Sequence, residues 1–174
     1  IHESIRNKDV FIIQTKGCDQ SINDMLMELL IMIDACKRSA VKNIYVIMPC
    51  YPYARQDKKE ESREPITAKL VANLLCAAGM TRLIVMDLHA AQIQGFFDIP
   101  VDNMYSIRLV KSYLDSWLFN DLSLASRQKG FVVISPDAGA TKRTLKFAKI
   151  LELDTIIMHK QRNYKKANSI DDIM

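Results

Sequence analysis

Four side chains that can bind a divalent cation lie close together in the segment 87–102. Asp87 and His89 directly follow a short apolar run that is typical of a buried strand, and they project from the same side of an extended chain. Asp98 and Asp102 come after a glycine and two phenylalanines. One imidazole and three carboxylates near a strand end could hold a cation between the protein and a phosphorylated substrate. The alternative is a loop whose acids cap helices and whose histidine makes ordinary hydrogen bonds.

A second group of polar side chains follows the apolar stretch 43–48. An arginine there could pair with a phosphate or stack on a base, and an amide could bond to a base edge, so the group could grip a nucleotide. The alternative is a charged loop in solvent, which an isolated charge run usually is. The group consists of Arg55, Gln56, Asp57, Lys58 and Lys59.

The segment 135–143 passes from a predicted strand straight into a predicted helix. Its small residues would let the backbone approach a ligand, and N–H groups at a helix start favour phosphate. Asp137 lies in this turn, and Lys142 and Arg143 add positive charge. The spacing is not that of a Walker A loop, and a turn that merely caps a helix has a similar composition.

The last apolar stretch, 155–158, is followed by a basic segment that begins at His159. Lys160 and Arg162 share a face if the chain stays extended, and two fixed cations could stabilise charge on a phosphoryl group in transit. The alternative is a basic strand exit that faces solvent. No histidine or cysteine sits in a recognisable hydrolase setting, so a nucleophile–base pair is not evident.

Strands and helices alternate along the chain, which predicts an α/β fold with mostly parallel sheets flanked by helices. Because ligands collect at the carboxyl ends of parallel strands, we expect acids from the centre and cations from the edges of a single sheet to face one magnesium–triphosphate group. A domain boundary is predicted near Tyr105. The predicted strands are 9–15, 43–48, 83–86, 131–135 and 155–158, the helices 21–38, 65–79, 107–118 and 142–151, and the polar connections 49–63 and 120–130.

Residue types predict further details of these elements. The strand 9–15 is β-branched and apolar and is expected to be buried. The helix 21–38 is apolar nearly all round in its middle, which indicates burial on more than one side, with a sheet and a second subunit as the candidate neighbours. Pro65 suits the first turn of the next helix, and Gly79 suits its C-cap.

Composition narrows the function. The 174-residue chain is 49% hydrophobic, enough to bury a core, and its net charge of +4 suits anionic small molecules without the massed basic residues typical of nucleic-acid binding. The four cysteines form no CxxC pair, so we expect reduced thiols and a cytoplasmic protein. Signal-like or membrane-spanning apolar runs are not found, and no membrane partner is expected. The chain starts at Ile1 and stops without a terminating signal, so a fragment of a longer protein is expected.

Three motifs, taken together, resemble those of the ribose-phosphate pyrophosphokinase (phosphoribosyl pyrophosphate synthetase) family. They are CYPYARQDKK at 50–59, SREPITAKLVA at 62–72 and MDLHAAQIQGFFDIPVDN at 86–103, and the middle motif is highly specific to the family. The resemblance runs in order over about 1–168, and SPDAG at 135–139 falls where the family has a later motif. It implies two phosphoribosyltransferase-like domains, with 1–104 as the ATP and metal side and 105–174 as the first, incomplete part of the second.

The resemblance implies a kinase-type transferase of nucleotide biosynthesis. With Mg²⁺ it would move the β,γ-diphosphoryl group of ATP to the 1-hydroxyl of ribose 5-phosphate, giving AMP and phosphoribosyl pyrophosphate. Relatives form rings of dimers, so a homo-oligomer is expected. By the same resemblance Arg55 and Gln56 contact ATP, and Asp57, Lys58 and Lys59 lie on the same loop. Asp87 and His89 lie at the metal–triphosphate site, Asp98 and Asp102 belong to the metal signature, and Asp137 is a metal-linked acid that faces the diphosphate. Lys160 and Arg162 act with His89 in catalysis.

Two parts of the family pattern are not found in this chain. The amino-terminal strand and its Phe-Ser-x-x-Glu segment would precede Ile1, and the acidic loop that holds ribose 5-phosphate would follow Met174. The 174 residues alone are therefore not expected to turn over. A non-catalytic regulatory subunit of the same superfamily and a plain nucleotide-binding α/β module are the alternatives, but the intact Arg55–Gln56 and Asp87–His89 motifs favour the enzyme.

Overall fold

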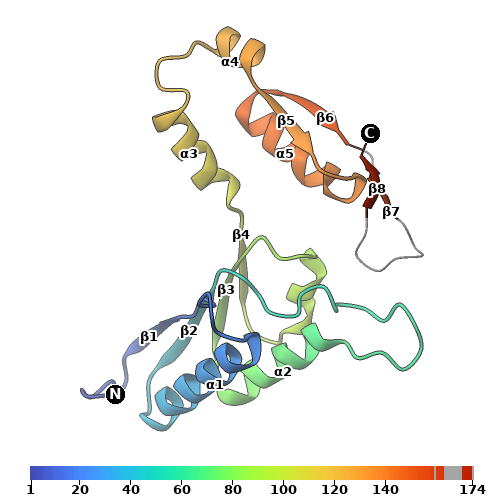
Figure 1. The fold of residues 1–174 in the computed structure, drawn as a ribbon. Coiled ribbons are helices and arrows are strands. Elements are labelled where there is room, and N and C mark those ends of the chain that lie inside the picture. Colours follow the sequence, from blue (N-terminus) through green and yellow to red (C-terminus); the bar gives the residue numbers. More distant parts are fainter. Residues whose placement is uncertain (159, 163–169, 174) are drawn as a thin grey trace. The chain divides into compact units, whose positions relative to one another are not determined.

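The computed structural model describes residues 1–158, 160–162 and 170–173. The chain divides into two compact units, Ile1–Tyr105 and Ser106–Met174, called unit 1 and unit 2 below. Strands alternate with helices along the chain, and the main sheet of each unit is parallel (Figure 1). The predicted α/β fold is confirmed, whereas the predicted single sheet is wrong, because the strands form separate sheets.

Unit 1 contains a four-stranded parallel sheet in the order β1-β2-β3-β4. The register pairs Ile47 with Ile84 in the centre and Met86 with Met104 at the carboxyl end. The loops that follow β2 and β3 therefore leave the sheet at the same edge. The strands are β1 (Asp9–Ile13), β2 (Asn43–Met48), β3 (Arg82–Met86) and β4 (Val101–Met104).

Helices α1 (Ile22–Arg38) and α2 (Thr67–Ala78) pack side by side against this sheet (Figure 1). The Ser21 hydroxyl accepts from the Asp24 N–H and so caps the start of α1, as its residue type predicts. α2 ends at Gly79 as expected, but Pro65 lies outside the first turn, because the helix begins only at Thr67.

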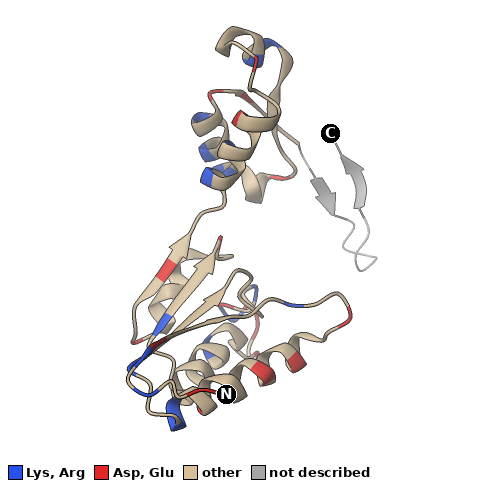
Figure 2. Cartoon of the chain, turned by 90° about the vertical axis from the view of Figure 1, so that its left-hand side faces the viewer, with Lys and Arg blue, Asp and Glu red and all other residues tan. Residues whose placement is uncertain are grey.

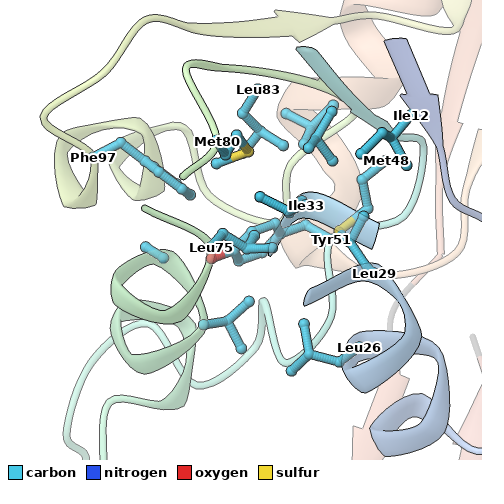
Figure 3. Close-up of a cluster of buried hydrophobic side chains, with 14 of the residues drawn as sticks. Ile12, Leu26, Leu29, Ile33, Met48, Tyr51, Leu75, Met80, Leu83 and Phe97 are labelled. Atoms are coloured by element: carbon cyan, nitrogen blue, oxygen red, sulfur yellow. The ribbon is translucent and has the colours of Figure 1, made fainter. Parts of the chain in front are cut away.

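The core of unit 1 lies between the two helices and the sheet (Figure 3). Leu29 and Ile33 of α1 and Leu75 of α2 are fully buried against Met48 and Leu83 of the sheet. In β2, residues that face the helices are buried and alternate with half-buried ones. This alternation fixes the register, because a shift by one residue would turn the apolar set away from the helices.

The opposite face of the sheet is open to solvent at β1. Phe11 and Ile13 are 59% and 68% exposed, while Ile12 between them is buried. The prediction of a buried first strand is therefore wrong, because among the described residues only the face of β1 that carries Ile12 packs into the core. On α1, Met27 and Ile31 are likewise exposed, so within the described residues this helix is buried along one stripe.

The strand β4 and the short 3-10 helix η1 (Ala91–Phe96) were not expected from the sequence. The segment 87–102 was interpreted as one loop, because β4 has only four residues, of which Asp102 and Asn103 are polar. β4 pairs parallel to β3. The chain after β3 must therefore return to the amino end of the sheet before β4 can begin.

Unit 2 contains a two-stranded parallel sheet, β5 and β6, against which α5 packs. The helix α4 was predicted as an irregular connection; its start is capped by the Ser123 hydroxyl, which accepts from the Ser126 N–H. Among the described residues, no helix has the length and apolar character needed to cross a bilayer. The elements are α3 (Ile107–Trp117), α4 (Leu124–Gly130), β5 (Val132–Ser135), η2 (Ala138–Ala140), α5 (Thr141–Leu151), β6 (Asp154–Ile157) and an antiparallel pair, β7 (Lys160–Arg162) and β8 (Ile170–Ile173).

Gly79 offers a direct test of the end of α2. Its φ is 121°, which L side chains rarely adopt, and an added Cβ would lie 2.6 Å from the Cδ atom of Lys37. We expect Gly79→Ala to lower the free energy of unfolding by more than about 1 kcal/mol in urea denaturation. Gly95→Ala is the control, because a Cβ there meets nothing within 4 Å. Equal stability of the two variants would contradict the argument that a side chain at position 79 strains the backbone.

Candidate functional site

Two loops with candidate site residues leave the carboxyl edge of the sheet of unit 1. β2 and β3 are hydrogen-bonded neighbours and run parallel, so the loop 49–66 and the turn at 87–90 begin side by side. The first loop carries Arg55 and Gln56, and the second carries Asp87 and His89. The structure thus brings these two predicted groups to one edge, where parallel sheets usually bind ligands.

The base of the first loop is fixed by Tyr51. Its hydroxyl donates to the Ala68 carbonyl at 2.8 Å, and its buried ring meets Phe97 edge to face, with 5.9 Å between centroids. Burial raises the pKa of Tyr51 far above its ordinary value, so the hydroxyl stays protonated and remains a donor. The loop therefore starts from a rigid point between α2 and the core.

Gln56 is tied to the first turn of α2. Its backbone carbonyl accepts from the Ala68 N–H at 3.1 Å, and its side-chain Oε1 accepts from the Thr67 hydroxyl at 2.6 Å. These two bonds satisfy the backbone N–H of Ala68 and the hydroxyl of Thr67 at the beginning of the helix. The side-chain oxygen of Gln56 is thus engaged within the protein, and the exposed Arg55 directly before it faces solvent.

Asp57 joins the two loops. Its Oδ2 accepts from Nε2 of Gln92 in η1 at 3.1 Å, and Gln92 lies only three positions beyond His89. The neighbouring Lys58 forms an exposed ion pair with Glu60 at 3.3 Å, and Lys59 is exposed. Because Asp57 and Gln92 belong to different loops, their hydrogen bond holds the predicted nucleotide loop beside the predicted metal turn.

The turn after β3 has an uncommon backbone conformation. Asp87 has a φ of 49°, a left-handed geometry that costs a residue with a side chain about 1–2 kcal/mol. The Asp87 N–H donates to the Met104 carbonyl at 2.8 Å, and the Leu88 N–H donates to Oδ1 of Asn103 at 3.2 Å. His89 is exposed and Asp87 is half-buried. Both residues follow the last residue of β3, Met86, and so lie beyond the end of that strand.

Asp98 and Asp102 do not join this group. Asp98 precedes β4 and lies near Cys76, close to the end of α2, which places it at the amino edge of the sheet. The carboxylate of Asp102 pairs with Arg82 at 2.6 Å, and this hydrogen bond lowers the pKa of Asp102. The reason is the parallel pairing of β4 with β3: Asp98 precedes the start of β4, and Asp102 pairs with Ile84 within the sheet, so neither acid lies at the turn that follows Met86. Among the described residues, no three His, Cys, Asp or Glu side chains gather to hold a metal ion.

In unit 2, Asp137 caps a helix start. Its Oδ1 accepts from the Ala140 N–H at 2.9 Å, and its carbonyl accepts from the Ser135 hydroxyl at 2.8 Å. This is the helix-capping alternative that the sequence left open. The following helix α5 carries four basic residues and no acid, and Figure 2 shows blue segments on the helices of unit 2. The basic residues are Lys142, Arg143, Lys146 and Lys149.

The structure describes the backbone of the predicted catalytic pair but not its side chains. Lys160 and Arg162 lie in β7, whose pairing with β8 shifts register between Gln161 and Arg162. His159 lies outside the described residues. The roles of both cations therefore stay predictions.

Three positioning contacts were missed by the sequence analysis, those of Thr67, Gln92 and Asn103. Each joins segments that are separated in the chain, by 11, 35 and 15 positions respectively. Threonine, glutamine and asparagine occur in many loops, so residue type alone gave no signal.

Comparisons with known proteins agree with the resemblance. Residues 1–79 match the N-terminal domain of ribose phosphate pyrophosphokinase. Ribose-phosphate pyrophosphokinase 2 of Schizosaccharomyces pombe is 52% identical over 170 residues, a match that covers 98% of this chain and 50% of that protein. The crystal structure of phosphoribosylpyrophosphate synthetase from Mycobacterium smegmatis superposes with a TM-score of 0.79 at 44% identity, covering 93% of this chain and 51% of that one. The chain spans about half the length of these relatives.

Proposed function

The chain is a homologue of the ribose-phosphate pyrophosphokinases, and on that premise we propose that the protein transfers the diphosphoryl group of ATP to the 1-hydroxyl of ribose 5-phosphate. The products are AMP and 5-phosphoribosyl 1-pyrophosphate, a precursor for nucleotide biosynthesis. The observation that carries the proposal is the 52% identity over 98% of the chain. The shared sheet edge of the Arg55 loop and the Asp87 turn supports it.

The exposed edge of unit 1 is the proposed site of the triphosphate. Arg55 is available to pair with a phosphate or to stack on the adenine. Asp87 and His89 would hold Mg²⁺, and two protein ligands suit this ion, which keeps waters and takes further oxygens from substrate phosphates. When bound, Mg²⁺ would neutralise charge on the triphosphate. Asp98 and Asp102 have no place in this proposed site.

Unit 2 supplies the proposed cations for the transferred group. Diphosphoryl transfer depends on placement and on neutralising charge, and needs no covalent partner from the protein. Lys160 and Arg162 are the proposed source of that charge. Asp137 caps the start of η2, and in the proposal this hydrogen bond orders the turn that leads into the basic helix α5.

A cytoplasmic homo-oligomer is part of the proposal. The apolar side chains of Met27 and Ile31 lie one turn apart on the outer face of α1 and are 58% and 61% exposed. A second subunit would bury them. Gel filtration with light scattering of the full-length protein tests this, and a monomer would contradict it.

The activity is tested by supplying the full-length protein with ATP, Mg²⁺ and ribose 5-phosphate and measuring AMP. We expect AMP to form only when all three are present and to stop when EDTA removes the metal. ATP binding without AMP would indicate a nucleotide-binding module. Association with an active synthetase, again without AMP, would indicate a regulatory subunit.

The bond between Asp57 and Gln92 predicts a measurable effect on ATP binding. Gln92→Ala frees the Arg55 loop from η1 and is expected to raise the KM for ATP by about three- to tenfold, since one hydrogen bond contributes roughly 1 kcal/mol. Gln94→Ala, in the same 3-10 helix, removes only a local bond to the Ala91 carbonyl and serves as the control. Identical KM values would show that the bond does not position the loop.

A further inference from the structure

Two consecutive N–H groups of the turn after β3 are held by two consecutive residues of β4. The ladder between the strands ends with the pair Met86 and Met104. Beyond it, the Met104 carbonyl accepts the Asp87 N–H at 2.8 Å. The next N–H, that of Leu88, has passed the end of the ladder, and it is a side chain, Asn103, that accepts it at 3.2 Å.

The identity of the accepting atom follows from the donor. A backbone N–H can only donate, so the Asn103 atom that faces it is the oxygen of the amide. Asn103 is half-buried and pairs with the buried Val85 in the register, while the side chain of Leu88 packs against the core of unit 1. Both the N–H and the side chain of Leu88 are therefore fixed.

A left-handed non-glycine residue persists only where its surroundings hold it. Asp87 is such a residue, and Asp87 and His89 flank the amide that Asn103 holds. We propose that Asn103 is a positioning residue: its side-chain oxygen keeps the turn in its left-handed form, so that Asp87 and His89 point together at the metal–triphosphate group. The catalytic part of this inference rests on the proposed function, whereas the structural part does not.

The structural part is tested by hydrogen exchange of the full-length protein, followed by mass spectrometry of peptides that cover residues 87–90. Asn103→Leu keeps the side-chain size and removes the acceptor, and exchange of this segment is expected to become about three- to tenfold faster. Asn103→Asp keeps an acceptor oxygen, and the segment is expected to remain protected. Unchanged exchange in the leucine variant would overturn the proposal, whether or not the protein makes AMP.

The catalytic part is tested by AMP formation as a function of Mg²⁺ concentration. Asn103→Leu is expected to lower kcat or to raise the required Mg²⁺ concentration by about 10- to 100-fold, as the loss of groups that orient metal ligands generally does. Asn103→Asp should recover most of the loss. Asn73→Leu, an exposed change on α2, is the matched control and should behave as the wild type.

The possible outcomes separate the two proposals. A wild-type protein that makes no AMP, combined with faster exchange in Asn103→Leu, rejects the proposed function and keeps the positioning role for the turn. Faster exchange with unchanged kcat and Mg²⁺ dependence rejects the catalytic consequence. If Asn103→Leu does not fold, as judged by circular dichroism, Asn103→Ala is measured instead. Faster exchange of residues 87–90 in this variant but not in Asn103→Asp supports the proposal, and unchanged exchange in Asn103→Ala overturns it.

Discussion

Replacing Lys160 or Arg162 by alanine in the full-length protein is expected to lower kcat by about 100-fold or more, with little change in the KM for ATP. The reason is that charge is redistributed over the transferred group and the leaving oxygen in the transition state, where fixed cations stabilise it more than they stabilise bound ATP. A contact made mainly in the transition state affects kcat, and its loss costs roughly 3 kcal/mol. Steady-state measurement of AMP formation at varied ATP concentrations gives kcat and the KM for ATP separately and so checks this prediction.

The controls for this prediction are two exposed cations elsewhere in unit 2. Lys149→Ala on α5 and Arg108→Ala on α3 remove the same charges and are expected to retain kcat within about twofold. An unchanged kcat in Lys160→Ala or Arg162→Ala removes that residue from the mechanism. A raised KM with normal kcat would instead place it in the binding of the ground state.

The second large effect is expected on stability, at Leu29. Its side chain is 0% exposed and lies between α1 and the sheet (Figure 3). Leu29→Ala leaves a cavity that the surrounding core fills only in part, so we expect unit 1 to lose about 2–5 kcal/mol of unfolding free energy. Urea denaturation followed by circular dichroism measures this loss.

Met27 supplies the control within the same helix. It is 58% exposed, so Met27→Ala removes little buried surface, and α1 should keep its stability within about 0.5 kcal/mol. A comparable loss in both variants would mean that the outer face of α1 is buried in solution. Such a result would favour the predicted subunit contact there.

The sequence predicted elements well where residue types point to one structure. The strand Asn43–Met48 has the predicted bounds, because its continuous apolar run is bounded by a polar residue before it and by Pro49 after it. Gly79 at the end of α2 was recognised from capping chemistry. These signals are local and need no knowledge of the fold.

The segment after β3 shows where such reasoning fails. Four potential metal ligands close in sequence were expected to be close in space, but a short strand carries Asp102 to an ion pair with Arg82. That strand could not be recognised from four residues, two of them polar. The contacts of Asp57 with Gln92 and of Leu88 with Asn103 depend in turn on how the loops meet once the sheet has formed.

The exposed first strand also affects how the chain behaves in solution. β1 presents Phe11, stacked on Tyr45 with 4.6 Å between ring centroids, and carries backbone N–H and C=O groups on the side away from β2. An exposed apolar edge strand of this kind readily accepts a strand from another molecule. Concentrated samples of the 174-residue chain should therefore be prone to aggregate by strand addition, and a lysine in place of Ile13 should delay that onset.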